Sequence, residues 1–270
     1  MIEAHQLRET NPGGSAVVQD RVDEDAGQAR PTKAMNIVVF GANGPTGQLV
    51  VRQGLAEGHA VTAVTRHPET FSLRHERLQV LRGDVFDPAS VEQAVAGRDA
   101  VLSTLGVPYS RKAITVYSEG VAHIVEAMKH TGVRRLVCVS SSATDPAVRF
   151  MDTGGGFFFE RILKPLITLT IGRTMYADMG SMEALVMNSE VDWTIVRPSG
   201  LFDTPAVTDY QMAEGHIRGR FTARADLADC LLRQLASDQY LHRALAVATF
   251  AVQPTVLELI RKEAFQSRKK

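Results

Sequence analysis

The chain has 270 residues, with 30 Lys and Arg balanced by 30 Asp and Glu, so its formal net charge is zero. This balance gives no basic footprint for nucleic-acid binding, and no stretch approaches the roughly 18 apolar residues of a membrane span. Cys138 and Cys230 lie in apolar segments, which is typical of buried thiols and indicates neither a disulfide framework nor a metal site. We therefore expect a protein that binds a small molecule, without nucleic-acid or membrane partners.

The first 34 residues show no pattern that would form a core. They contain no aromatic residue and no sustained hydrophobic period, so they bury too little apolar surface to offset the entropy of ordering. We predict a disordered leader at residues 1–34 and a single domain at residues 35–270, monomeric or homodimeric. Met35 directly precedes the first predicted strand and is an alternative natural start. Because the N-terminus lacks the basic and apolar regions of a signal peptide, a cytoplasmic location is expected.

The organising stretch of the chain is a glycine-rich turn between a strand and a helix. Four apolar residues at 37–40 indicate a buried parallel strand, and the pattern GxxGxxG follows at Gly41, Gly44 and Gly47. Gly41 permits the turn, Gly44 lets a pyrophosphate approach the backbone, and Gly47 lets the helix pack closely on the sheet. Pro45 suits a first helical turn. The free N–H groups of that turn bind phosphate, although a plain tight connection has the same local pattern.

A second strand at residues 60–65 follows the predicted helix 47–57 and completes a βαβ unit. In a dinucleotide fold the end of this strand faces the adenosine ribose, where an acid accepts from the 2′-hydroxyl or an arginine pairs with a 2′-phosphate. Arg66 stands there and no acid does. The sequence therefore favours NADP over NAD, with an arginine merely solvated at the loop start as the alternative.

The next two strands end in residues suited to the same ligand. Strand 78–81 leads to Asp84, at the edge where open α/β sheets bind ligands, and Asp87 is the predicted N-cap of helix 88–96. Asp84 can accept from an adenine amino group or tie down its own turn. Strand 99–104 ends at Leu105 and Gly106, where a glycine leaves room for a cofactor.

A long helix at residues 113–131 and a strand at 134–139 deliver Ser140, Ser141 and Ser142 to this edge. Their hydroxyls can donate to a cofactor amide or a substrate carbonyl, and a serine-rich turn is the alternative. Five strands that alternate with helices predict a doubly wound parallel α/β sheet with right-handed crossovers and helices on both faces.

The regular alternation breaks at residues 145–172, which combine three consecutive glycines with three consecutive phenylalanines. This composition suits a lid or a wall of the substrate pocket, or an insertion packed on the domain or a partner subunit. Beyond it we predict a helix at 174–188, a strand at 192–197, an irregular stretch at 203–223 with a short β segment near 216–221, a helix at 225–236, a strand near 245–250 and a terminal helix from 255.

Six segments in this order carry a resemblance to a known family: IVVFGANGPTGQLV, TAVTRHPE, LRGDVFDP, DAVLSTLG, VRRLVCVSSS and VDWTIVRPSGL. Together they resemble the atypical short-chain dehydrogenase/reductase group with an NAD(P)H-binding domain, which includes NmrA-like proteins and biliverdin reductase B, also called flavin reductase. The resemblance covers residues 35 to about 250. It implies a Rossmann-like sheet, NADP(H) as cofactor, and flavin, quinone, tetrapyrrole or other carbonyl substrates.

The resemblance also implies roles for individual residues along the predicted ligand edge. Arg66 would bind the 2′-phosphate, Asp84 and Val85 the adenine, Leu105 and Gly106 the central part of the cofactor. Ser140 and Ser141 would border the nicotinamide. The residues that would hold the pyrophosphate are Gly41, Asn43, Gly44, Pro45, Thr46 and Gly47, and those that would flank the nicotinamide are Pro198, Gly200 and Leu201.

The chain departs from the usual short-chain dehydrogenases at the YxxxK pair. Tyr176 lies in the corresponding helix, but Gly180 stands where the lysine would be. A phenol, with an ordinary pKa of about 10, is a poor base near neutrality without that lysine. We therefore predict an NADPH-dependent reductase in which hydride passes to an electron-poor acceptor beside Ser141 and Tyr176. The alternatives are a non-catalytic NADP-binding redox sensor of the NmrA type and a biosynthetic epimerase or dehydratase.

Overall fold

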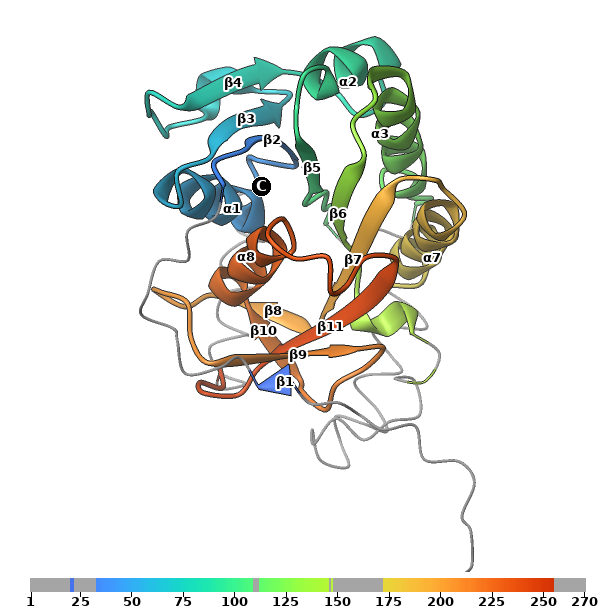
Figure 1. The fold of residues 1–270 in the computed structure, drawn as a ribbon. Coiled ribbons are helices and arrows are strands. Elements are labelled where there is room, and N and C mark those ends of the chain that lie inside the picture. Colours follow the sequence, from blue (N-terminus) through green and yellow to red (C-terminus); the bar gives the residue numbers. More distant parts are fainter. Residues whose placement is uncertain (1–19, 22–32, 109–111, 146, 148–171, 255–270) are drawn as a thin grey trace, which may run out of the picture.

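A mostly parallel β-sheet forms the centre of the computed structural model, which describes residues 20–21, 33–108, 112–145, 147 and 172–254 (Figure 1). Its described strands are β1 (Asp20–Arg21), β2 (Asn36–Phe40), β3 (Ala60–Thr65), β4 (Leu78–Arg82), β5 (Ala100–Ser103), β6 (Arg135–Val139), β7 (Asp192–Pro198), β9 (Tyr210–Glu214) and β11 (Arg243–Thr249). They lie in the order β1-β9-β11-β7-β6-β5-β2-β3-β4. Only the pairs β9–β11 and β1–β9 are antiparallel.

Helices cover both faces of this sheet, which confirms the predicted Rossmann-like architecture (Figure 1). The described α-helices are α1 (Pro45–Ala56), α2 (Pro88–Val95), α3 (Ser118–Thr131), α7 (Arg173–Met187) and α8 (Arg224–Arg233), and the short 3-10 helices are η1 (Pro68–Thr70) and η2 (Ser142–Thr144). One apolar core lies between the sheet and α1 with α8, and a second lies between the sheet and α2, α3 and α7.

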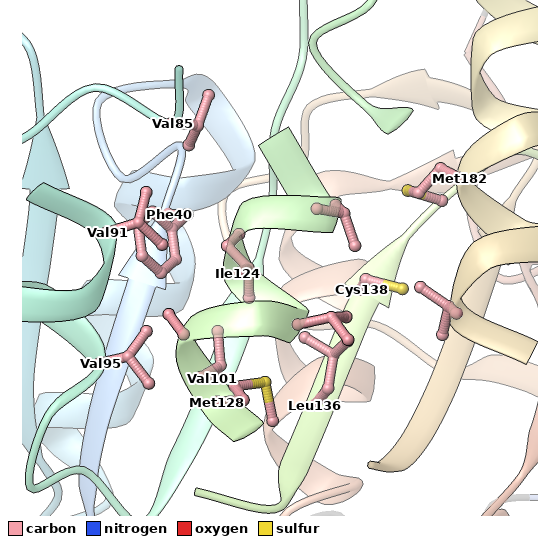
Figure 2. Close-up of a cluster of buried hydrophobic side chains, with 14 of the residues drawn as sticks. Phe40, Val85, Val91, Val95, Val101, Ile124, Met128, Leu136, Cys138 and Met182 are labelled. Carbon is pink, nitrogen blue, oxygen red and sulfur yellow. The ribbon is translucent and has the colours of Figure 1, made fainter. Parts of the chain in front are cut away.

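The second core shows why α3 forms where it does. Figure 2 shows Ile124 and Met128 of α3 pointing toward sheet residues such as Val101 and Leu136. All four side chains are fully buried, and the two α3 residues are four apart, the spacing that places side chains on one face of a helix. The buried face of α3 thus fixes the helix against the strands whose ends carry the predicted ligand residues.

The strand order reverses at β2, and this reversal locates the expected ligand edge. From β2 the chain builds β3 and β4 on one side of the sheet, then crosses over to build β5, β6 and β7 on the other. In open α/β sheets, ligands bind outside the carboxyl ends of the strands at such a switch point. The glycine-rich turn directly follows β2, so it lies at the switch point.

Most predicted element boundaries agree with the structure within one to three residues, with two exceptions. The long helix begins at Ser118 rather than at 113, because Asp178 of α7 accepts from the peptide N–H of Tyr117 (2.9 Å) and from the hydroxyl of Ser118 and so caps the helix there. The stretch 203–223 contains β9, which pairs with β11 some thirty residues later, a partnership that a local pattern does not reveal. Its second strand, β10 (Phe221–Ala223), pairs with β8 (Gly200–Phe202) in a separate small sheet.

Parts of several sequence predictions lie outside the described residues. These include almost all of the proposed lid at 145–172, the terminal helix from 255 and most of the leader. Within the leader, Asp20–Arg21 forms β1 on the edge of β9, a strand that the sequence did not predict. Among the described residues, every helix is too short or too polar to span a membrane, and no group of three His, Cys, Asp or Glu side chains is arranged to hold a metal ion.

Candidate functional site

The glycine-rich turn has the geometry that its sequence indicates. Gly41 adopts φ +76°, and a Cβ on it would lie 2.5 Å from the carbonyl oxygen of Thr104, just beyond β5. A Cβ on Gly47 would lie 2.2 Å from the carbonyl oxygen of Gly41. Because real Cβ contacts are longer than 3.0 Å, both positions require glycine. The predicted roles of Gly41 in the turn and of Gly47 in close helix packing are therefore confirmed.

The N-terminus of α1 is free to meet an anion. Gly44 is its N-cap without a side-chain cap, Pro45 is its first residue, and its first turn holds no acidic residue. Among the described residues, the peptide N–H groups of Thr46 and Gly47 have no acceptor. Unpaired N–H groups at the positive end of a helix dipole bind phosphate well. The cradle between β2 and α1 thus fits a pyrophosphate.

Asn43, predicted to touch the same pyrophosphate, connects this turn to the segment after β3. Its side-chain Nδ2 donates to Oγ1 of Thr70 in η1 (3.3 Å), and its carbonyl oxygen accepts from Nε2 of Gln48 (3.1 Å). The hydroxyl of Thr70 in turn donates to the carbonyl of His67 (2.8 Å). The glycine-rich turn and η1 are therefore held side by side.

The end of β3 carries an arginine and also an acid that the sequence reasoning missed. Arg66 is exposed, and no described residue binds its guanidinium. Glu69 of η1 lies at the same edge, where it accepts from Arg82 Nη2 (3.1 Å) and pairs with His67 Nδ1 (3.2 Å). A hydrogen bond from its own backbone lowers the pKa of Glu69, and His67 and Arg82 lower it further. The expectation that no acid stands near this strand end is wrong, because η1 folds Glu69 back toward it.

Asp84 and Val85, the residues predicted to bind adenine, mainly make contacts within the protein. Oδ1 of Asp84 accepts from the peptide N–H of Phe86 (3.1 Å), so the carboxylate does tie down its own turn, as the alternative held. The side chain of Val85 is buried in the core (Figure 2), and its carbonyl accepts from Nδ1 of His123 (2.7 Å). An adenine contact here would use the second oxygen of Asp84 or the peptide N–H of Val85.

The ends of β5 and β6 differ in how much room they leave. Leu105 is half-buried and Gly106 is exposed, with no atom within 4 Å of a Cβ built on Gly106. Ser140 is only 3% exposed, and its Oγ is a buried atom without a hydrogen-bond partner. An unpartnered buried hydroxyl is costly unless a ligand or water completes it. Ser141, by contrast, uses its Oγ to accept from the N–H of Ala143 (3.2 Å). Ser141 therefore stabilises its own turn, as expected for the alternative of a serine-rich turn.

On the other flank, Pro198, Gly200 and Leu201 belong to the junction of β7 and β8. Pro198 is buried at the end of β7, Leu201 is half-buried, and Gly200 is exposed. The N–H of Gly200 donates to the carbonyl of Arg220 (2.9 Å), and a Cβ on Gly200 would lie 3.1 Å from that oxygen. Glycine at 200 is thus explained by close pairing with β10, and its contact with a nicotinamide stays a prediction.

A family model described as NAD(P)H-binding matches residues 41–238, more than half of the chain and the whole of this strand edge. The chain belongs to the NAD(P)H-binding family. This confirms the predicted NAD(P)H-binding family, whereas the short-chain dehydrogenase/reductase and NmrA-like assignments stay predictions. The uncapped N-terminus of α1 is the part of the structure that this family membership explains most directly.

Relatives and solved structures agree with this membership. An uncharacterized chloroplastic protein of Arabidopsis thaliana is 29% identical over 181 residues, which are 64% of this chain and 61% of that protein. Cinnamoyl-CoA reductase 1 of rice is 32% identical over 114 residues, 39% of this chain and 34% of the enzyme. The chain thus spans less than two thirds of either relative. A short-chain dehydrogenase/reductase from Veillonella parvula in complex with NADP shares the fold, with a TM-score of 0.65, 18% identity, and coverage of 80% of this chain and 95% of that one.

This NAD(P)H-binding protein also contains a buried ion triad at the candidate site. The sequence analysis did not predict this triad. Arg197 of β7 binds Glu183 of α7 through Nε (2.9 Å) and Nη2 (2.7 Å), and Asp145 after η2 through Nη1 (3.3 Å). Burial alone would lower the pKa of Arg197, but its bonds to Glu183 and the charge of Asp145 outweigh burial and raise it. Three elements at the carboxyl edge are thus clamped together.

The triad joins the turn of Ser141 to the helix of Tyr176. The hydroxyl oxygen of Thr144 lies 2.8 Å from Oε1 of Glu183 and 2.6 Å from the carbonyl oxygen of Ser141, so its one hydrogen is shared between these two acceptors. Tyr176 is half-buried on α7 and packs against the core that α7 shares with α3. Gly180 lies one turn further along α7, with open space where a side chain would be. The structure therefore connects the two predicted catalytic residues through α7, and it supplies no lysine four residues beyond the tyrosine.

Proposed function

We propose that the protein is an NADPH-dependent reductase that delivers hydride to an electron-poor acceptor, a flavin, a quinone or an activated carbonyl compound. The observation that carries the proposal is the uncapped N-terminus of α1, held by Gly41 and Gly47 against Thr104 at the switch point of the sheet. Exposed Arg66 at the end of β3 supports NADPH over NADH, because a guanidinium can pair with the 2′-phosphate through two hydrogen bonds. The name of the rice relative supports a reductase.

The remaining residues of the site would orient the reactants. Bound NADPH supplies the hydride itself, so the protein contributes position and electrostatics. The N–H groups of Thr46 and Gly47 would hold the pyrophosphate, and the unpartnered Oγ of Ser140 would complete its hydrogen bonding on the cofactor or substrate beside it. Ser141 accepts through its Oγ within its own turn, so its hydroxyl hydrogen stays available to donate.

The described residues of this site give little assistance to proton transfer. Tyr176 lacks the lysine of the usual pair, since Gly180 occupies that position. This favours acceptors that take hydride without concerted protonation, or that receive the proton from solvent or from Ser141. The missing lysine also favours a second candidate function, a redox sensor that binds NADP and catalyses no reaction.

The test is consumption of NADPH, followed by its absorbance, with purified protein and separate panels of flavins, quinones and aldehydes. We expect at least one panel to be reduced well above the protein-free rate, with Arg66→Ala lowering that rate at subsaturating NADPH. Tight NADPH binding without turnover on any panel would replace the reductase by the sensor.

A further inference from the structure

A small network of exposed ions lies at the end of β3, the strand end that faces the adenosine ribose in a dinucleotide fold. Glu69 is bound by Arg82 at 3.1 Å and by His67 at 3.2 Å. The three side chains are 57%, 68% and 63% exposed, so none of them is needed to fill the core. The Glu69 carboxylate therefore binds two basic side chains although none of the three contributes to packing of the core.

The network is anchored to both elements that would border the adenosine ribose. Nη1 of Arg82 donates to the carbonyl oxygen of Arg66 (2.9 Å), and β4 places Arg82 directly opposite Thr65, the last residue of β3. On the other side, Thr70 in the same 3-10 helix as Glu69 accepts from Asn43 of the glycine-rich turn. Glu69 thus lies between the pyrophosphate cradle and the strand end that carries Arg66.

We propose that Glu69 occupies the place of the 2′-phosphate and sets the preference between NADPH and NADH, with Arg82 as a second phosphate-binding cation. The inference rests on the cofactor of the proposed function. A carboxylate and a phosphate oxygen accept the same guanidinium hydrogen bonds, so the two compete for Arg82. NADPH must displace Glu69 and meet its negative charge, whereas NADH carries no group that competes. Glu69 therefore weakens NADPH selectively.

The experiment measures dissociation constants of NADPH, NADH and 2′,5′-ADP for the full chain and for Glu69→Gln and Arg82→Ala. We expect Glu69→Gln to bind NADPH and 2′,5′-ADP about twofold to fivefold more tightly and Arg82→Ala to bind them more weakly by a similar factor, the range of an exposed ion pair. Binding of NADH should stay unchanged in both variants.

Glu126→Gln is the matched control, because Glu126 is also 57% exposed and also pairs with two basic side chains, Lys129 and His130, in the C-terminal half of α3. It should leave all three constants unchanged. An unaltered ratio of NADPH to NADH affinity in Glu69→Gln would overturn the inference. So would a loss of NADH affinity in that variant, which would make Glu69 an acceptor for the ribose hydroxyl. Measuring these dissociation constants requires no hydride acceptor. If no panel is reduced but Glu69→Gln alters the ratio of NADPH to NADH affinity, the proposed reaction is refuted and this inference still stands.

Discussion

Gly47 at the start of α1 and Gly41 at the end of β2 are in such close contact that a Cβ on Gly47 would lie 2.2 Å from the carbonyl oxygen of Gly41. The first turn of the helix can approach the strand only because the side chain is absent. Gly41 also lies against Thr104 just beyond β5, and among the described residues the peptide N–H groups of Thr46 and Gly47 in the first helical turn have no acceptor. The contact between the two glycines therefore shapes the cradle.

Gly47→Ala should lower the free energy of unfolding by about 1 to 3 kcal/mol, the usual cost of forcing an atom into a packed site, and should weaken NADPH binding. Chemical denaturation and cofactor titration measure the two effects. Gly180→Ala is the matched control on α7, where a Cβ meets nothing within 4 Å. Alanine is the better helix former by about 1 kcal/mol, so this variant should be at least as stable as the wild type. Equal stability of the two variants would contradict the packing argument.

The parts of the fold that sequence predicts well are those that local signals determine. The strand, glycine-rich turn and helix at 36–56 follow from apolar runs and glycines within a few residues, and Asp87 caps α2 as predicted by accepting from Ala89 (3.2 Å). The start of α3 was misplaced because its cap, Asp178, comes from a helix 60 residues away. Local spacing carries no trace of such a partner.

The candidate site likewise contains residues whose roles follow from local sequence and residues whose roles depend on distant partners. The structural roles of Gly41 and Gly47 were predicted correctly because they follow from the local strand, turn and helix, whereas the role of Arg66, which directly follows β3, stays a prediction. The triad of Arg197, Glu183 and Asp145 was missed because its members meet only in the folded chain. One signal was present: Arg197 is a charged residue near the end of the mostly apolar strand β7, and a buried charge needs a partner.

Arg197→Met should lower the free energy of unfolding by about 3 to 5 kcal/mol, because it leaves two buried carboxylates without their cation. Arg134→Met is the matched control. Arg134 binds Asp192 through two hydrogen bonds of 3.1 Å, but its side chain is 65% exposed, so its loss should cost far less stability than the loss of Arg197. Denaturant unfolding at neutral pH compares the two, and equal losses would show that the triad is no more important than a surface pair.

Cys138 and Cys230 should not react with a thiol reagent in the native protein near pH 8. Burial raises the pKa of Cys138 to about 12, with a further contribution from the charge of Glu183, and burial also raises the pKa of Cys230. Both thiols therefore stay protonated well above neutral pH as well as inaccessible. Titration with a chromogenic disulfide should count neither thiol before unfolding and both afterwards. Rapid modification of either one in the native state would show that its helix or strand opens readily.

Tyr176→Phe should lower the rate of hydride transfer only modestly, because in the proposed reaction solvent or Ser141 supplies the proton to an electron-poor acceptor. A positioned general acid contributes about a hundredfold to ten-thousandfold, so the two mechanisms are well separated. Steady-state rates are compared for Tyr176→Phe and Ser141→Ala, with NADPH affinity measured to show that the cofactor site is intact. A collapse of the rate in the tyrosine variant alone would establish a tyrosine-centred mechanism that works without the lysine.

The central claim is that the strand edge between β3, β2 and β5 binds NADPH, with Arg66 on its 2′-phosphate. Its most direct test is calorimetric titration of NADPH and NADH into the wild type and Arg66→Ala. Arg52→Ala serves as the matched control, since Arg52 is also exposed and lies on α1 of the same βαβ unit. A charge-assisted arginine–phosphate pair contributes roughly 1.5 to 3 kcal/mol, so Arg66→Ala should weaken NADPH about tenfold to a hundredfold and leave NADH unchanged. Equal weakening of both cofactors, or no binding of either by the wild type, would contradict the claim.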